Sequence, residues 1–150
     1  IRWLNDEGYY VFVVTNQAGI AKGLYTHAQM DGLHAWMVEQ FGLRGIRFEK
    51  VYHCPHHPAG IVAPYAGACD CRKPKPGMLF TAREEFGVNL AESLLVGNAE
   101  SDIEAALAAG LPTTVLIDEE PVPRKTKAGV VIRSMGDLPE RLKRHGVFPA

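Results

Sequence analysis

The chain has 150 residues, 47% of them apolar, and a formal net charge of −1. This length and apolar content fit one globular domain with a buried core, and the near-neutral charge argues against a broad basic surface for nucleic acid. The sequence has no apolar run of about 18 residues and no signal-peptide pattern, so we expect a cytoplasmic protein without a membrane span.

The first expected elements are a short helix ended by Gly8 and a strand over residues 9–15. The strand is a continuous run of β-branched and aromatic residues, which is typical of a strand covered on both faces. Thr15 and Asn16 end it, and ligands bind at the carboxyl ends of strands in open α/β sheets. These side chains are therefore candidates for donating to an anionic oxygen, with a plain polar turn as the alternative. Because the chain starts at Ile1 inside a helical pattern, we also expect a further segment upstream.

A helix over residues 27–41 and a strand over 48–53 come next. Thr26 and Gln29 form a capping-box pattern, apolar residues recur at helical spacing after them, and Gly42 ends the helix. These two elements fill most of the spacing before the first cysteine. The sequence therefore leaves no room there for a large inserted domain, which favours a small substrate in an open site.

All three cysteines of the chain lie within residues 54–71. Cys54 is paired with His56 and Cys69 with Cys71, each pair separated by one residue, and a loop of twelve residues joins the pairs. Three thiols and an imidazole supply the four ligands of a closed tetrahedral zinc site. A disulfide between Cys69 and Cys71 would close a very tight ring and leave one thiol over. We therefore predict a structural zinc loop over 54–71, with ordinary cysteines beside a chance histidine as the alternative.

A basic turn follows the last of these cysteines directly. Arg72, Lys73 and Lys75 lie beside two prolines, which stiffen the backbone, and ahead of Gly77, which lets it turn. Such a turn holds cations over a phosphate dianion at little entropic cost. A solvated basic turn is the alternative.

The second half of the chain continues the alternation of helices and strands. The expected elements are a helix from Pro76 to Phe86, strands over 94–96, 113–117 and 130–132, helices over 103–109 and 138–144, and a loop over 118–128. Strands that alternate with helices predict a Rossmann-like, doubly wound parallel sheet in a three-layer α/β domain. We expect residues 1–150 to form a single domain.

Three polar segments thus lie at the ends of successive strands: Thr15 with Asn16, Lys73, and residues 98–102. Their order and residue types resemble the haloacid dehalogenase (HAD) superfamily of aspartate-nucleophile phosphatases. The chain is similar in particular to the bacterial D-glycero-D-manno-heptose 1,7-bisphosphate phosphatases and the related histidinol-phosphate phosphatases. The resemblance covers nearly the whole chain, and its specific segments are Val14–Ala21, Cys54–Pro58 and Cys69–Pro74.

The resemblance implies a Mg²⁺-dependent phosphomonoester hydrolase with a structural Zn²⁺. Thr15 would hydrogen-bond the transferring phosphoryl oxygens, with Asn16 close by on the substrate side. Lys73 would neutralise the charge that develops in the transition state. Arg72 would bind the phosphate that is not cleaved, because its planar fork suits a phosphate. The implied substrate is a small sugar bisphosphate of lipopolysaccharide precursor synthesis, and we expect a monomer.

Two departures from the family pattern concern the carboxylates. Asn98 stands where the family usually has a magnesium-binding aspartate, and Asp102 would steady that site from nearby. No Asp-x-Asp occurs in the sequence, although this motif supplies the family's nucleophile, so the chain alone would form no aspartyl-phosphate. In the family fold the strand with this motif is central, between the strands ending at Thr15 and Gly97, and we expect it upstream. A histidinol-phosphate phosphatase and a catalytically inactive zinc-bearing module that binds a phosphorylated ligand stay open as alternatives.

Overall fold

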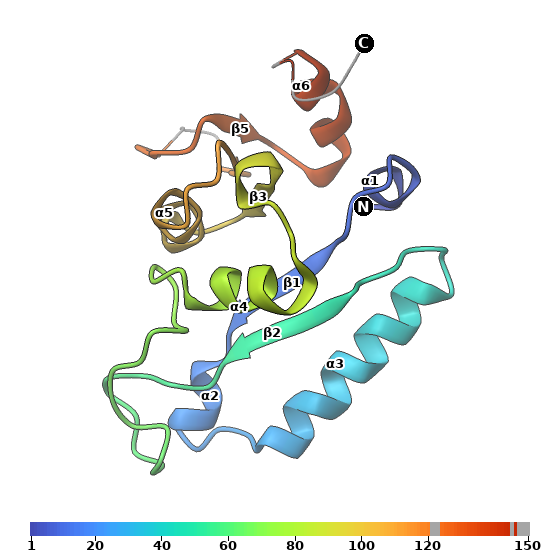
Figure 1. Cartoon of the computed structure of the whole chain (residues 1–150). Helices are drawn as coiled ribbons and strands as arrows, with labels where there is room; N and C mark the ends of the chain where they lie inside the picture. Colours follow the sequence, from blue (N-terminus) through green and yellow to red (C-terminus); the bar gives the residue numbers. More distant parts are fainter. Residues whose placement is uncertain (121–123, 145, 147–150) are drawn as a thin grey trace. The chain divides into compact units, whose positions relative to one another are not determined.

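The structure is a computed structural model that describes residues 1–120, 124–144 and 146 (Figure 1). Its helices and parallel strands alternate as expected, which confirms the α/β architecture. The chain divides into two compact units, Ile1–Arg72 and Lys73–Ala150, and the single domain expected from length stays a prediction. None of the described helices has the length and hydropathy of a membrane span.

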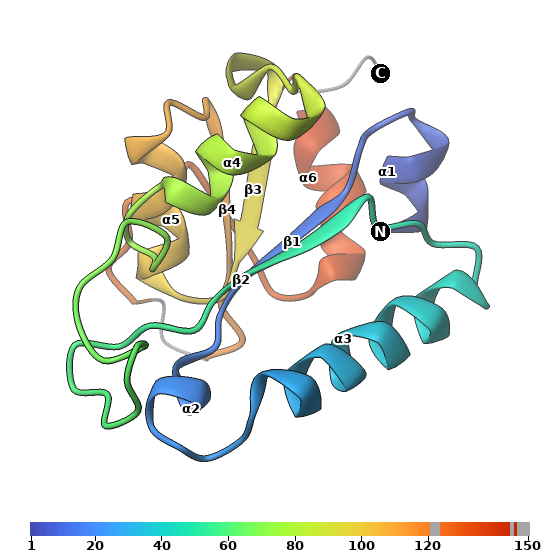
Figure 2. The ribbon, with the colours of Figure 1, turned by 60° about the horizontal axis from the view of Figure 1, so that its bottom comes forward.

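The first unit is built on a two-stranded parallel sheet. Its elements are α1 (Arg2–Asp6), β1 (Phe12–Asn16), α2 (Ala18–Ala21), α3 (His27–Gly42) and β2 (Lys50–Cys54). The register places Thr15 opposite His53 and Asn16 opposite Cys54, so polar residues and the first cysteine share one end of the sheet. Helix α3 runs beside this sheet (Figures 1 and 2), and its His27 and His34 rings lie 5.5 and 6.0 Å from the ring of His53.

The start of α3 confirms the predicted capping box. The backbone N–H of Gln29 donates to Thr26 Oγ1 at 3.2 Å, and the backbone N–H of Thr26 donates to Gln29 Oε1 at 2.9 Å. Two amides that have no partner within the helix are thereby satisfied. This cap fixes the start of α3 after the short segment that follows α2.

The second unit is built on a three-stranded parallel sheet in the order β3-β4-β5. Its elements are α4 (Gly77–Phe86), a short 3₁₀ helix (Leu90–Glu92), β3 (Leu94–Gly97), α5 (Glu100–Ala108), β4 (Thr113–Ile117), β5 (Val130–Ile132), a second 3₁₀ helix (Met135–Asp137) and α6 (Leu138–Arg144). Ile103 of α5, Val115 and Leu116 of β4, and Leu138 and Leu142 of α6 are almost fully buried and form its core. This core packs α5 and α6 against the sheet.

Several element bounds differ from the sequence prediction; β2, for example, runs over Lys50–Cys54 and not over residues 48–53. Helix α5 begins at Glu100, earlier than predicted, because the Asp102 carboxylate accepts from the backbone N–H of Ala99 and starts the helix there. Strand β1 begins at Phe12 and not at Tyr9, because the backbone N–H of Tyr9 donates to the carbonyl of Leu4 in α1, at 2.9 Å. Helix α2 was not predicted, since its four residues are too short to show a periodic pattern.

Candidate functional site

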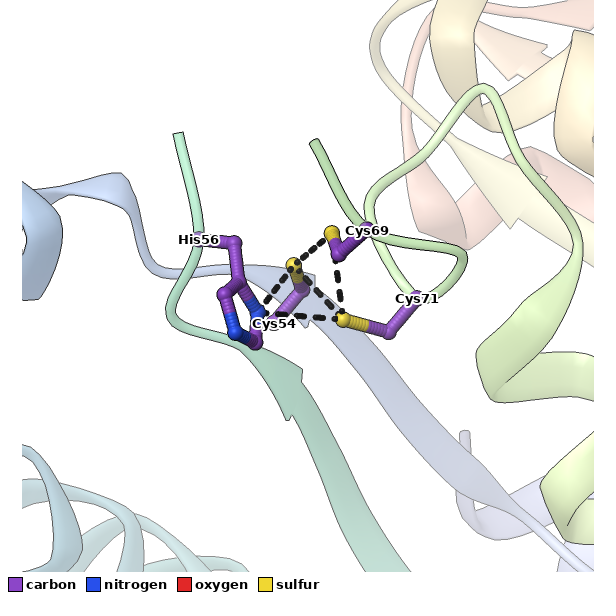
Figure 3. A group of neighbouring side chains, drawn as sticks. All are labelled: Cys54, His56, Cys69 and Cys71. Carbon is purple, nitrogen blue, oxygen red and sulfur yellow. Dashed lines mark hydrogen bonds between the residues drawn. The ribbon is translucent and has the colours of Figure 1, made fainter. Parts of the chain in front are cut away.

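The four predicted zinc ligands lie together beyond the end of β2 (Figure 3). One ligand atom from each of Cys54, His56, Cys69 and Cys71 lies within 4.8 Å of every other. Cys54 is the last residue of β2 and is fully buried, so one ligand is anchored by the sheet itself. Three thiols and one imidazole are the donor set of a closed structural zinc site. The residues therefore fit a zinc ion.

The short distances inside the cluster identify the ligand atoms. The Sγ atom of Cys71 lies 2.9 Å from that of Cys54 and 3.4 Å from that of Cys69. The Nδ1 atom of His56 faces the same point, 3.5 Å from the Sγ atom of Cys71. Burial raises the pKa of the Cys54 and Cys71 thiols, so both hold protons at neutral pH in the absence of a metal. Because zinc binds thiolates, metal binding releases these protons and tightens as the pH rises.

The loop between the ligand pairs is closed by backbone hydrogen bonds. The backbone N–H of His57 donates to the carbonyl of Tyr65 at 3.1 Å, and that of Gly67 donates to the carbonyl of His57 at 3.1 Å. The N–H groups of Ile61 and Val62 both donate to the carbonyl of Ala21 at 2.7 and 3.0 Å, which ties the loop to the end of α2. The loop is therefore fastened at its tip to α2 and at its base to the metal cluster.

Arg72 directly follows the last zinc ligand. Its Nη1 atom donates to the backbone carbonyl of His56 at 3.3 Å, and the residue is half-buried. The guanidinium is thus held against the cluster by one of its donors. A guanidinium has five N–H donors, so one bond to a carbonyl is compatible with the predicted role of Arg72 in phosphate binding.

Thr15 and Asn16 lie at the end of β1, as predicted. The Thr15 hydroxyl oxygen accepts a hydrogen bond from the Gln17 side-chain amide at 3.2 Å. The backbone N–H of Gln17 donates to the carbonyl of Cys54 at 2.7 Å, so this strand end is joined to the first zinc ligand. No role for Gln17 was predicted, because a hydrogen bond between two neighbouring side chains leaves no pattern in the sequence.

Lys73 and Asp102 form a nearly buried ion pair in the second unit. Lys73 Nζ lies 2.7 Å from Asp102 Oδ1, and the two side chains are 11% and 9% exposed. Asp102 Oδ2 also accepts from the backbone N–H groups of Asn98 and Ala99 at 3.1 and 3.0 Å. A Cβ at Gly97 would lie 2.3 Å from the Asp102 Cβ, so only glycine fits beside this carboxylate. The Asp102 carboxylate therefore fixes both the Lys73 ammonium and the turn after β3.

The two candidate magnesium ligands differ in what they offer. Asn98 is exposed, and within the described part of the chain its side chain makes no hydrogen bond. Both oxygens of Asp102 are already engaged by Lys73 and by the turn. Asn98 thus presents an amide oxygen of the kind that magnesium accepts, whereas Asp102 holds the turn on which Asn98 lies. A magnesium site at these residues stays a prediction.

The chain is similar to known phosphatases in sequence. A family model described as HAD-hydrolase-like matches residues 70–120, which include Arg72, Lys73 and Asp102. The chain is 41% identical over 145 residues to the D-glycero-β-D-manno-heptose-1,7-bisphosphate 7-phosphatase of Yersinia pestis, covering 95% of this chain and 77% of that protein. It is 40% identical over 147 residues to the protein of the same name from Escherichia coli K12, covering 96% and 77%.

Solved structures give the same result. A HAD-like phosphatase of Mesorhizobium loti superposes with a TM-score of 0.81 at 32% sequence identity, covering 92% of this chain and 66% of that one. The D,D-heptose 1,7-bisphosphate phosphatase of B. bronchiseptica, complexed with magnesium and phosphate, superposes with a TM-score of 0.76 at 26% identity, covering 97% and 80%. The predicted resemblance is therefore confirmed in both sequence and fold.

Proposed function

The chain belongs to the family of HAD-like D-glycero-β-D-manno-heptose-1,7-bisphosphate 7-phosphatases, and from this premise we propose that it removes the 7-phosphate of a heptose 1,7-bisphosphate. One observation supports the proposal most strongly. Two adjacent cations, Arg72 and Lys73, are held by separate anchors, one by the carbonyl of a zinc ligand and the other by a nearly buried carboxylate. A substrate with two phosphates carries two anionic groups, and a pair of cations can bind one each.

Each proposed role follows from the chemistry of the side chain. Lys73 neutralises charge on the phosphoryl group that is transferred, and the fixed ion pair means that little reorganisation is needed as that charge develops. Thr15 donates a hydrogen bond to a phosphoryl oxygen, and Asn16 lies beside it to contact the substrate. Arg72 holds the phosphate that stays on the sugar, since a guanidinium can give two parallel hydrogen bonds to one phosphate.

Two metal ions are part of the proposal. Cys54, His56, Cys69 and Cys71 would hold zinc, which would brace the loop next to Arg72 at a distance from the bond that is broken. Magnesium, when bound, supplies charge neutralisation at the phosphoryl oxygens, and the relative from B. bronchiseptica was crystallised with magnesium and phosphate. In this chain the amide oxygen of Asn98 is the proposed ligand, and Asp102 fixes the turn behind it. An amide ligand without charge gives weaker magnesium binding than a carboxylate would.

The nucleophile is the remaining part of the proposal. The 150 residues contain no Asp-x-Asp, so the residues described above provide substrate binding and charge neutralisation but no carboxylate for attack on phosphorus. We propose that a further strand with this motif completes the catalytic site. The protein as its gene encodes it is accordingly the form to assay.

We also propose a cytoplasmic, monomeric enzyme. The three cysteines are free thiols, and zinc coordination requires them reduced, which a reducing compartment maintains. The proposed partner is the phosphorylated sugar alone.

The test is a comparison of substrates and of two arginine variants. The gene-encoded protein is assayed with magnesium on heptose 1,7-bisphosphate and on histidinol phosphate, and the position of cleavage is followed by ³¹P NMR. We expect loss of the 7-phosphate and a higher kcat/KM on the bisphosphate. Arg72→Lys should raise KM for the bisphosphate by about 10-fold, the cost of a charge-assisted hydrogen bond, whereas Arg83→Lys, at an exposed ion pair, should not.

Three results would contradict the proposal. A higher kcat/KM on histidinol phosphate would assign the alternative substrate. Absence of any magnesium-dependent turnover, with phosphorylated ligands still bound, would assign the inactive binding module. Cleavage of the 1-phosphate in place of the 7-phosphate would contradict the proposed position of hydrolysis.

A further inference from the structure

A chain of side-chain hydrogen bonds leads to the Thr15 hydroxyl from Tyr25, which directly precedes the N-cap of α3. The Tyr25 hydroxyl lies 2.5 Å from Gln17 Oε1, and Gln17 Nε2 lies 3.2 Å from Thr15 Oγ1. All three side chains are half-buried and belong to the first unit. The chain is therefore short, partly shielded from water and contained in one compact body.

The position of Tyr25 depends on Gly19 in α2. A Cβ at Gly19 would lie 2.1 Å from the Tyr25 Cε1 atom and 2.7 Å from its hydroxyl oxygen. No side chain can be accommodated at such distances without moving the ring. The absence of a side chain at Gly19 thus lets the tyrosine ring lie against α2 and reach Gln17.

The direction of donation in this chain determines where the Thr15 hydrogen points. The Gln17 amide can donate only through nitrogen and accept only through oxygen, whereas each hydroxyl has one hydrogen to donate. When the Tyr25 hydroxyl donates to Gln17 Oε1, Gln17 Nε2 donates to Thr15, and the single hydrogen of Thr15 is left for another acceptor. Hydrogen bonds that run in one direction also polarise one another.

We propose that Gln17 and Tyr25 are positioning residues that direct the Thr15 hydroxyl hydrogen toward a phosphoryl oxygen of the substrate. The inference rests on the proposed function, because that function places Thr15 at the phosphoryl group. An anionic phosphoryl oxygen only accepts hydrogen bonds. A bound phosphoryl group therefore favours the arrangement in which Tyr25 donates to Gln17, Gln17 donates to Thr15, and Thr15 donates to the phosphoryl oxygen. Neither Gln17 nor Tyr25 needs to touch the substrate.

A double-mutant cycle with Thr15 tests this inference in the gene-encoded protein. Gln17→Met keeps the length of the side chain without its donor, and Tyr25→Phe removes only the hydroxyl. We expect each to lower kcat/KM by about 3- to 10-fold, the cost of one neutral hydrogen bond. In a Thr15→Val background, where no hydroxyl is left to orient, each should lower it less than 2-fold. Tyr10→Phe, at an exposed tyrosine, is the matched control and should leave kcat/KM unchanged.

A second measurement separates this inference from the proposed function. The dissociation constant of inorganic phosphate, measured by ³¹P NMR, should rise for Gln17→Met and Tyr25→Phe but not for Tyr10→Phe, with zinc content and Tm unchanged. If Gln17→Met and Tyr25→Phe lowered kcat/KM equally in the wild-type and Thr15→Val backgrounds, their role would be merely structural and the inference would be overturned. Unchanged phosphate binding in both variants would overturn it too. A protein that binds phosphate in this Thr15-dependent way but hydrolyses no substrate would contradict only the proposed function.

Discussion

The loop of residues 54–72 and the turn of residues 97–102 both hold side chains proposed to bind phosphate or magnesium, but different forces hold them. The loop depends on four ligand side chains that converge on one point, and two of its three thiols stay protonated until a metal arrives. The turn depends on one carboxylate that accepts from two backbone amides and pairs with Lys73. We therefore expect the metal cluster at the base of the loop to depend on an ion, in addition to the backbone hydrogen bonds of the loop, whereas the turn is held by groups of the chain alone.

Loss of one zinc ligand should have the largest effect. His56→Ala leaves three ligands and should lower the free energy of unfolding of the first unit by several kcal/mol, because the binding free energy of a structural zinc is about 10 kcal/mol or more. His57→Ala is the control, since its ring faces a backbone amide outside the cluster. Zinc stoichiometry and Tm of both variants provide the measurement. Equal zinc content and equal Tm in His56→Ala and the wild type would mean that the loop does not need the ion.

Removal of the carboxylate at the turn comes next. Asp102→Ala leaves the Lys73 ammonium nearly buried without its counter-charge and two amides without an acceptor, so we expect a loss of about 3–5 kcal/mol. Glu104→Ala, at the exposed pair with Lys127, should cost less than about 1 kcal/mol. Urea denaturation measures both. Zinc content should be unchanged in each variant, and a loss of zinc in Asp102→Ala would show that the two regions are not independent.

A methyl group at Gly97 perturbs the same turn by sterics alone. Its Cβ would lie 2.4 Å from Asp102 Oδ2, so Gly97→Ala should displace the carboxylate and cost about 1–3 kcal/mol. Gly32→Ala, inside α3 with open space around the new Cβ, should stabilise by about 0.5–1 kcal/mol. Opposite signs for the two variants in thermal denaturation support the steric account, and destabilisation of equal size would contradict it.

The smallest expected effect concerns Asp118, a second carboxylate of the same unit that holds backbone amides. It accepts from the N–H groups of Arg124 and Glu120 at 3.2 and 3.4 Å, and these bonds, with the Arg124 charge, lower its pKa. A lowered folded pKa gives stability that is present above the unfolded pKa, about 3.9, and is lost as the pH falls through the folded value. Asp118→Asn should therefore flatten the fall in Tm below about pH 4. An unchanged pH dependence would show that Asp118 does not contribute.

The loop was largely predictable from the sequence, whereas the turn was predictable only in part. Cys54, His56, Cys69 and Cys71 are rare residue types at short spacing, and few other structures explain such a pattern. The sequence placed Asp102 near the site. It did not show that one carboxylate oxygen pairs with Lys73, because 28 residues separate the two in sequence. Contacts over such separations are fixed by packing, and a single sequence does not reveal them.

The ends of the elements show the same limit. The capping box of Thr26 and Gln29 is local and was predicted correctly. Helix α2 and the Tyr25 contact on Gly19 were missed, because a four-residue helix has no period and a glycine gives no sign of the ring that lies on it. The strands are parallel as predicted but are divided between two sheets, an arrangement that depends on pairing and not on pattern.

Hydrogen exchange before and after zinc chelation tests the central contrast most directly. Zinc-loaded protein is compared with protein from which the ion has been removed, and exchange is followed at single amides. The account predicts that amides of the loop, such as His57 and Gly67, lose protection, while Asn98 and Ala99, whose amides donate to Asp102, keep theirs. Loss of protection in both regions, or in neither, would contradict it.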